Sequence, residues 1–188
     1  MVLGFQFHGW AVIGLLSAIK NTWGRGTVSA LQDGLCSTNK ETLQKKIHAS
    51  SKYDSSLVVE LLLELEKGKG DGTGSAFYRA GRGAGLMAIE VMFPVYKSME
   101  NEERFFNSFP KLWDRMMEDA GTVEVSVAAN KALVKICGYP SREELWSRFW
   151  EGWLVGAVET ACGSKDVTTA REMFADSKIV RHEFQISW

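Results

Sequence analysis

Hydrophobic residues recur at α-helical spacing through the first two thirds of the chain and alternate with polar residues in the last third. Apolar stripes, capping residues and glycine or proline breaks separate the helical segments from one another. The pattern predicts helices over residues 9–23, 27–35, 40–49, 57–67, 76–93 and 102–118. Pro94 interrupts the fifth of these helices, and Pro110 kinks or restarts the last one.

Short motifs place some of these boundaries. Thr38 and Glu41 have the spacing of a capping box for the third helix, and Asp54 is placed to cap the fourth. Residues 68–74 are rich in glycine and predict a flexible loop. Residues 1–19 carry no charge, but polar side chains and glycines interrupt them. We therefore expect a buried first strand and helix there rather than a membrane or signal segment.

Beyond Gly121 the hydrophobic period becomes two, which is typical of half-buried strands. The predicted strands cover residues 123–127, 133–137, 166–174 and 178–187, and a long helix opened by a capping box at 141–144 separates the two pairs. The expected fold class is therefore α+β, in one domain over residues 1–188. Its N-terminal helical half (1–120) packs on a C-terminal antiparallel four-stranded sheet of ββαββ order (121–188).

Charge and cysteine content exclude several classes of protein. The chain has 22 basic and 23 acidic residues, a net charge of −1, so it lacks the electrostatic signature of a nucleic-acid binder. Its three cysteines form no C-x-x-C pair, which disfavours a zinc ribbon or thioredoxin-like chemistry and favours free thiols in a reducing compartment. We expect a cytoplasmic protein without a membrane segment and without a metal site.

Motifs for catalysis are also missing from the sequence. The glycine-rich stretches at 70–74 and 81–85 lack the spacing of a phosphate-binding loop, and no nucleophile–base motif occurs. His182 shares its strand phase with Val180, Phe184 and Ile186, so it lies on the apolar face of the predicted sheet. Such a histidine is either a hydrogen-bonded core residue or a ligand contact. We therefore expect no enzyme.

Aromatic side chains gather on the two helices that flank the first strand pair. The helix over 102–118 carries Phe105, Phe106, Phe109 and Trp113, and the helix over 143–161 carries Trp146, Phe149, Trp150 and Trp153. These rings either form a close-packed core or line an apolar cavity between the helical half and the sheet.

Several of these segments together are similar to one known family. They are the opening helix from Gly9 to an aromatic–glycine pair at 23–24, Tyr53-Asp54 before a leucine-rich helix, Ala80-Gly81-Arg82, and the closing hairpin, long helix and strand pair. This order resembles the heme nitric oxide/oxygen-binding (H-NOX) domain of the bacterial type and its relatives, the 4-vinyl-reductase-type small-molecule-binding domains. The resemblance spans nearly the whole chain and implies an H-NOX-like fold and a sensory role in signal transduction.

Two departures from the family bear on heme. Heme-binding members carry a proximal histidine on the helix before the sheet, and residues 102–118 contain none. Their propionate motif, Y-x-S-x-R, is matched by Tyr139 and Ser141, whereas Arg142 comes one residue early. A five-coordinate heme needs an axial donor, and only Cys137 or His182 could supply it in a different geometry. The cysteines that vinyl-reductase-type relatives carry near the last strands are also absent after Cys162.

We expect a non-catalytic sensory or regulatory domain that binds a small apolar or amphipathic ligand, without histidine-ligated heme. The candidate ligand-binding residues are Phe105, Phe109, Trp113, Trp146, Trp150 and His182, with Tyr139, Ser141 and Arg142 as a polar rim. Two alternatives remain open. One is a heme-based NO or O2 sensor with an atypical axial ligand. The other is an interaction module without a pocket, which forms homodimers or docks on a signalling partner through the Gly152/Gly156 face of its last helix.

Overall fold

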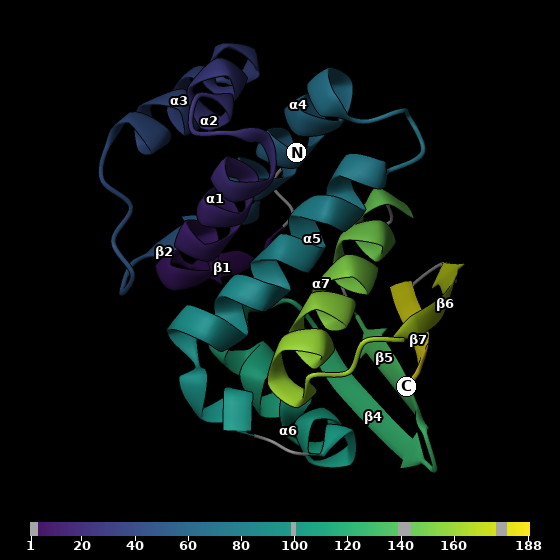
Figure 1. Cartoon of the computed structure of the whole chain (residues 1–188). Coiled ribbons are helices and arrows are strands. Elements are labelled where there is room, and N and C mark those ends of the chain that lie inside the picture. The colour runs from purple at the N-terminus through teal and green to yellow at the C-terminus, as the bar shows by residue number, and fades with distance from the viewer. Residues whose placement is uncertain (1–3, 99–100, 139–143, 176–179) are drawn as a thin grey trace.

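Helices occupy most of the chain up to residue 116, and the four longest strands follow them (Figure 1). The computed structural model describes residues 4–98, 101–138, 144–175 and 180–188. The helices are α1 (Gly9–Trp23), α2 (Thr27–Leu31), α3 (Ser37–Gln44), α4 (Ser55–Lys69), α5 (Ser75–Met87), α6 (Glu102–Met116) and α7 (Glu144–Cys162), with short turns η1 (Gln32–Gly34), η2 (Ala88–Met92) and η3 (Pro94–Ser98). The strands are β1 (Gln6–His8), β2 (Lys52–Asp54), β3 (Met117–Glu118), β4 (Thr122–Ala128), β5 (Lys131–Cys137), β6 (Thr168–Ala175) and β7 (Val180–Ser187).

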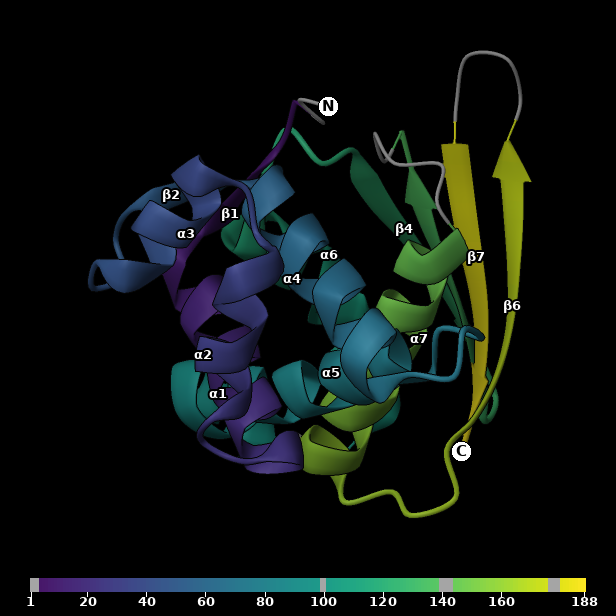
Figure 2. The ribbon, with the colours of Figure 1, turned by 90° about the horizontal axis from the view of Figure 1, so that it is seen from above.

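The four C-terminal strands form one antiparallel sheet in the order β4-β5-β7-β6. Val134 of β5 pairs with Phe184 of β7, and Ile136 pairs with His182, so these side chains share the buried face. α6 packs on β4, and α7 packs on β6 (Figure 2). Figure 2 shows the layers: the sheet, then α7, then α5, with α1, α2 and α3 on the side away from the sheet. The predicted α+β fold with its ββαββ order is confirmed.

A second, smaller sheet joins distant parts of the chain. β1 is its central strand and pairs antiparallel with β2 on one side and β3 on the other, in the order β2-β1-β3. Its middle residue Phe7 lies opposite both Tyr53 and Met117. The expected first strand is therefore present, but β2 and β3 were not predicted. The expected helix over 102–118 ends at Met116, because the next two residues extend to pair with β1.

The helix boundaries follow local chemistry with two corrections. α1 spans the predicted residues 9–23, and Asp54 caps α4 by accepting the backbone N–H of Ser56. The predicted capping box at Thr38 is wrong, because α3 begins at Ser37 and the extended residue before it, Cys36, donates its N–H to Glu60. α6 continues through Pro110 as one helix, so it does not restart there.

α5 and α7 pack at backbone contact through two pairs of glycines. A Cβ atom added to Gly81 would lie 2.0 Å from the carbonyl oxygen of Phe149, and one added to Gly152 would lie 2.1 Å from that of Tyr78. Gly85 and Gly156 make the same kind of contact one helical turn further along. This close approach places α7 in the interior, so residues on every side of its central part are buried. The glycine face of α7 is thus covered by α5 of the same chain and is not a free docking face.

In the parts of the chain that the structure describes, no helix combines the length and the apolar composition required to cross a bilayer.

Candidate functional site

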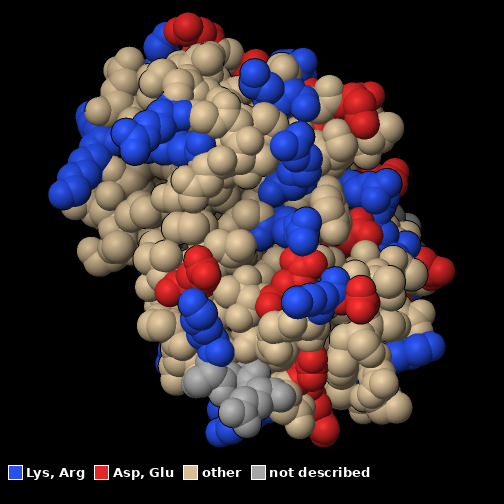
Figure 3. Space-filling model, in the orientation of Figure 1, with Lys and Arg blue, Asp and Glu red and all other residues tan. Residues whose placement is uncertain are grey.

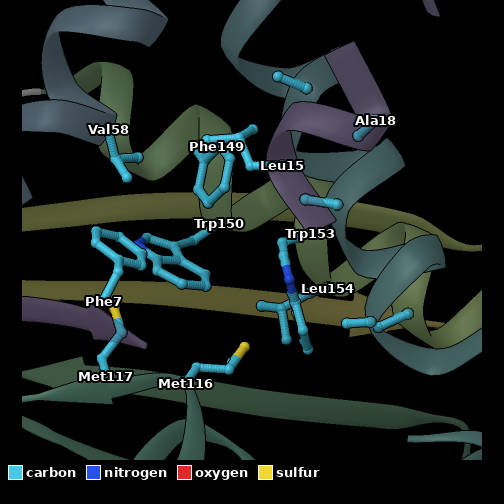
Figure 4. Packing of buried hydrophobic residues seen from close by; sticks show 14 of the residues in the cluster. Phe7, Leu15, Ala18, Val58, Met116, Met117, Phe149, Trp150, Trp153 and Leu154 are labelled. Carbon is cyan, nitrogen blue, oxygen red and sulfur yellow. The ribbon is translucent and has the colours of Figure 1, made fainter. Parts of the chain in front are cut away.

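A small apolar cavity lies in the interior where α1, α5, α6 and α7 meet. Its volume is about 20 Å³, which is room for a single water-sized molecule. It is lined by Phe7, Trp10, Ala11, Gly14, Leu15, Val58, Ala84, Ala88, Met92, Met116, Phe149, Trp150 and Trp153. Figure 4 shows several of these side chains facing one another between the helices. An apolar cavity of this kind stays dry and favours an uncharged occupant.

The cavity lies near the surface on one side only. Trp10 and Ala11 of α1 and Met92 of η2 are partly exposed, whereas Leu15, Val58, Met116 and Trp150 are buried. Phe93, next to Met92, packs edge-on against Trp10 with ring centroids 4.7 Å apart. The wall that a ligand would have to cross is therefore formed by α1 and by the π-helical turn η2. Such turns occur often at functional sites.

The aromatic residues of α6 and α7 pack mainly against one another. The rings of Trp113 and Trp150 have centroids 4.7 Å apart, and those of Phe109 and Trp153 are 5.5 Å apart. These distances are typical of close-packed aromatic pairs. Phe105 and Trp146 are likewise fully buried, the former against Phe106 and the latter against Phe7. The aromatic belt is thus core, with a small void beside it.

The structure therefore separates the predicted site residues. Among those that it describes, only Trp150 lines the cavity, and Phe105, Phe109, Trp113 and Trp146 lie behind it in the core. Tyr139, Ser141 and Arg142 lie outside the described residues. The α1 residues Trp10, Ala11 and Gly14 were not predicted as site residues. The small residue Gly14 within an apolar helix was the only sequence signal for this wall.

His182 is a hydrogen-bonded core residue of β7. Its side chain is fully buried, and its Nδ1 shares a short hydrogen bond with Oγ of Ser147 on α7. The strand phase predicted the burial, but Ser147 lies 35 residues away and was not predicted as its partner. The pair couples a hydroxyl to an imidazole, as a nucleophile and base would be. However, both side chains have no exposed surface, so a substrate cannot reach them.

A polar cluster connects α7 to the edge strand β6. The carboxylate of Glu151, which is nearly buried, contacts Nε of Arg171 at 3.1 Å and an amino nitrogen of Arg148 at 3.3 Å. It also accepts a hydrogen bond from the Thr169 hydroxyl at 2.7 Å. Tyr78 lines a surface groove together with Glu151 and Thr169, and burial raises the pKa of its phenol. Because the charges neutralise one another, we interpret this cluster as a tie between helix and sheet.

Comparisons with known proteins identify the fold. No protein-family model matches the sequence, and no curated protein matches it. Solved structures do match it: the chain has the fold of H-NOX domains, as the sequence resemblance predicted.

Three of these structures show the extent of the match. An oxygen-binding H-NOX domain related to soluble guanylate cyclases, in its oxygen complex, is 14% identical and aligns over 96% of this chain and 94% of its own, with a TM-score of 0.68. A variant of the T. tengcongensis H-NOX is 13% identical over 96% of both chains, with a TM-score of 0.66. A Cs H-NOX variant carrying 4-cyano-L-phenylalanine is 13% identical over 96% of this chain and 95% of its own, with a TM-score of 0.71.

The described residues do not fit a heme in this interior. The cavity of about 20 Å³ is far below the 300–1,000 Å³ of ordinary ligand pockets, because indole and phenyl rings fill the space between α6 and α7. The residues that line it include no histidine, cysteine or tyrosine, and Met92 and Met116 offer only thioether sulfurs. Cys137 is also a poor thiolate donor, since burial raises the pKa of its thiol. In the described part of the chain, no three His, Cys, Asp or Glu residues group as metal ligands would.

Proposed function

We propose that this chain is a non-catalytic sensory or regulatory domain, which holds a small uncharged molecule in its interior cavity and has no histidine-ligated heme. One observation carries the proposal: rings fill the space between α6 and α7, yet an apolar cavity remains beside partly exposed Trp10 and Met92. The size of this cavity suits a single molecule not much larger than water, such as dioxygen.

The fold and the cavity wall both support a sensory role. One H-NOX structure of this fold is an oxygen complex, so the architecture admits a diatomic ligand in that protein. Here the wall combines a tightly packed part with a short one: α5 and α7 are in backbone contact, whereas η2 has only one turn. We infer that a ligand acts on α1 and η2, and that these elements pass the change to a signalling partner in the cytoplasm.

Gly14 provides a sharp test, because it lines the cavity and an added Cβ atom meets nothing within 4 Å. Gly14→Ala fills part of the cavity without a clash. Gly68→Ala is the matched control, since Gly68 lies exposed in α4 and its added Cβ atom is also unhindered. Both variants gain up to about 1 kcal/mol of helix propensity. Only Gly14→Ala should weaken binding.

The readout is paramagnetic relaxation of methionine methyl signals under dissolved dioxygen. We expect enhancement at Met92 and Met116, which line the cavity, to exceed that at buried Met117, and we expect Gly14→Ala to abolish the excess. Equal enhancement at all three methyl groups would refute the cavity as a ligand site.

Hemin titration tests the competing function of a heme-based sensor. The proposal predicts no stoichiometric complex with a sharpened Soret band. If such a band forms, the proposal fails in favour of heme binding, and loss of the band in His182→Ala or Cys137→Ala then identifies the axial donor.

A further inference from the structure

A second groove lies on the outer side of α1, away from the interior cavity. It has a volume of about 520 Å³, within the range of ligand-binding sites. α1 and α2 form one wall, and α3 with the extended residues after it forms the other. The lining residues are Ile13, Leu16, Ser17, Lys20, Arg25, Val28, Ser29, Gln32, Leu43, Lys45, Lys46 and Ile47. We call this site the α1–α3 groove.

The floor of the α1–α3 groove is aliphatic because of helical periodicity. Ile13, Leu16 and Lys20 follow at spacings of three and four, so they share one face of α1. This face points away from the core, since Val12, Leu15 and Ile19 form the buried stripe. Ile13, Leu16, Leu43 and Ile47 remain partly exposed in the groove. The sequence therefore leaves a patch of partly exposed apolar surface beside charged side chains.

The rim of the groove is basic and contains no acid. Lys20, Arg25, Lys45 and Lys46 are exposed, and none forms an ion pair with a residue that the structure describes. In two other grooves a lining cation has an acidic partner: Lys67 pairs with Glu64 at 2.5 Å, and Arg148 beside Tyr78 pairs with Glu151 at 3.3 Å. In a chain of net charge −1, four unpaired cations around one groove are a concentrated positive field. Figure 3 shows Lys and Arg side chains over the region of α1, α2 and α3.

We propose that the α1–α3 groove binds an amphiphilic carboxylate with a saturated aliphatic chain. The chain lies over Ile13, Leu16, Leu43 and Ile47, and the carboxylate contacts Lys45, Lys46 and Arg25 at the rim. Apolar burial supplies the attraction for the tail, and the uncompensated cations select the negative head group. This site is distinct from the interior cavity, although both use α1: Trp10, Ala11 and Gly14 face inward, and Ile13, Leu16 and Ser17 line the groove.

Three probes with the same twelve-carbon tail separate charge from hydrophobicity: dodecanoate, dodecyl maltoside and dodecyltrimethylammonium, each below its critical micelle concentration. Calorimetric titration of the whole chain should show the tightest binding for dodecanoate and the weakest for the cationic probe. Binding of dodecanoate should weaken as salt is added, because the rim charges are exposed. Equal affinity for dodecanoate and the maltoside would overturn the proposal.

Charge reversal locates the site. The double variant Lys45→Glu/Lys46→Glu should weaken dodecanoate binding by about tenfold, since it reverses two exposed charges at the rim. Lys131→Glu/Lys165→Glu makes the same change in net charge at exposed positions in β5 and after α7, and should leave affinity within about twofold. An equal loss in both double variants would mean that only net charge matters and would refute the site.

Methyl signals of the parent chain keep the proposal testable if a charge-reversal variant does not fold. In the parent chain, dodecanoate should shift the methyl signals of Ile13 and Ile47 and leave that of Ile89, which is buried in η2, unchanged. Binding to phosphatidylserine vesicles is the last experiment. If the chain binds these vesicles but does not respond to free dodecanoate, the groove contacts a membrane surface and the proposed carboxylate ligand is rejected. The cavity assay with Met92 and Met116 is independent, so either proposal can fail alone.

Discussion

Two acidic side chains organise the glycine-rich loop before α5. The carboxylate of Glu66 accepts the backbone N–H groups of Gly72, Gly74 and Ala76, at 3.0, 3.1 and 2.9 Å. It therefore occupies the α5 N-terminus, where a phosphate-binding loop would place its anion. Asp71 accepts hydrogen bonds from Thr73 and Ser75 within the same loop. The rejection of a phosphate-binding loop on sequence spacing thus has a structural reason.

The Asp71 carboxylate predicts a pH dependence of stability. Hydrogen bonds from Thr73 and Ser75 lower the pKa of this carboxyl from 3.8 to about 2. Because the folded pKa is depressed, the stabilisation is complete above the unfolded pKa near 4 and is lost as the pH falls toward 2. Asp71→Ala should therefore unfold at lower urea concentration than the parent at pH 7, and the two midpoints should converge near pH 2. A constant difference across this range would contradict the assignment. Asp166→Ala, at an exposed loop position, serves as the control.

Single residues were predictable where their partners are near in sequence. Asp54 caps a helix two residues away, so its role could be inferred from spacing. The Thr38 prediction failed because the residue that precedes α3 is Cys36, held by Glu60 from α4, two residues before the position that the motif indicates. The burial of His182 follows from strand phase, whereas Ser147 comes from a different element, and only the three-dimensional packing brings it there.

Among the elements, the pairing of α5 with α7 depends on four glycines. Gly81 and Gly85 are four residues apart, as are Gly152 and Gly156, so each pair lies on one helix face. Each missing side chain lets the opposite backbone approach, and a salt bridge between Arg82 and Glu159 at 2.9 Å flanks the contact. The glycine spacing is visible in the sequence, but the identity of the covering helix is not. This is why a free docking face on α7 was a reasonable alternative.

Adding a methyl group to this contact should separate the helices. In Gly152→Ala the new Cβ atom would lie 2.1 Å from the Tyr78 carbonyl oxygen, a distance that backbone atoms cannot relieve by rotation. We expect a loss of about 3 kcal/mol in the free energy of unfolding, at the upper end of the range for overpacked cores. Urea denaturation measures it, with Gly68→Ala as the control that should be neutral or slightly stabilising. A change in oligomeric state without loss of stability would instead favour the docking face.

The two elements that the sequence pattern did not predict, β2 and β3, are very short strands. β2 has three residues and β3 has two, which is too few for an alternating pattern. Their pairing with β1 joins residues 6–8 to residues 52–54 and 117–118. Strand pairing over such separations depends on the assembled core rather than on local propensity.

For the molecule as a whole, the order of elements predicted the fold, but not the shape of the interior. A ββαββ pattern after a helical half restricts the topology to few arrangements. The cavity, however, is what remains after thirteen residues from seven segments have packed, and a shift of one methyl group would change it. Sequence periodicity therefore located the aromatic core correctly and could not decide between a core and a pocket.

The helix layer and the sheet are joined by Glu151, and its removal should weaken the whole molecule. Glu151→Ala leaves Arg171, whose side chain is 16% exposed, without its buried partner. We expect the free energy of unfolding to fall by about 3 kcal/mol. Arg82→Ala removes a more exposed pair, 54% on the arginine, and should cost less than about 1 kcal/mol. Thermal or urea unfolding compares the two, and equal losses would show that the Glu151 cluster is no stronger than a surface ion pair.

The contact between the glycines of α5 and α7 also has a consequence for folding during translation. α5 is complete at Met87, but the surface that covers it begins only at Glu144. At roughly 5–20 residues per second, translation leaves the bare backbone of α5 uncovered for several seconds. During that interval the glycine face of α5 lacks α7, its native partner. Chaperone dependence should therefore peak before α7 emerges, and a synonymous slowdown of translation between these two helices should increase aggregation.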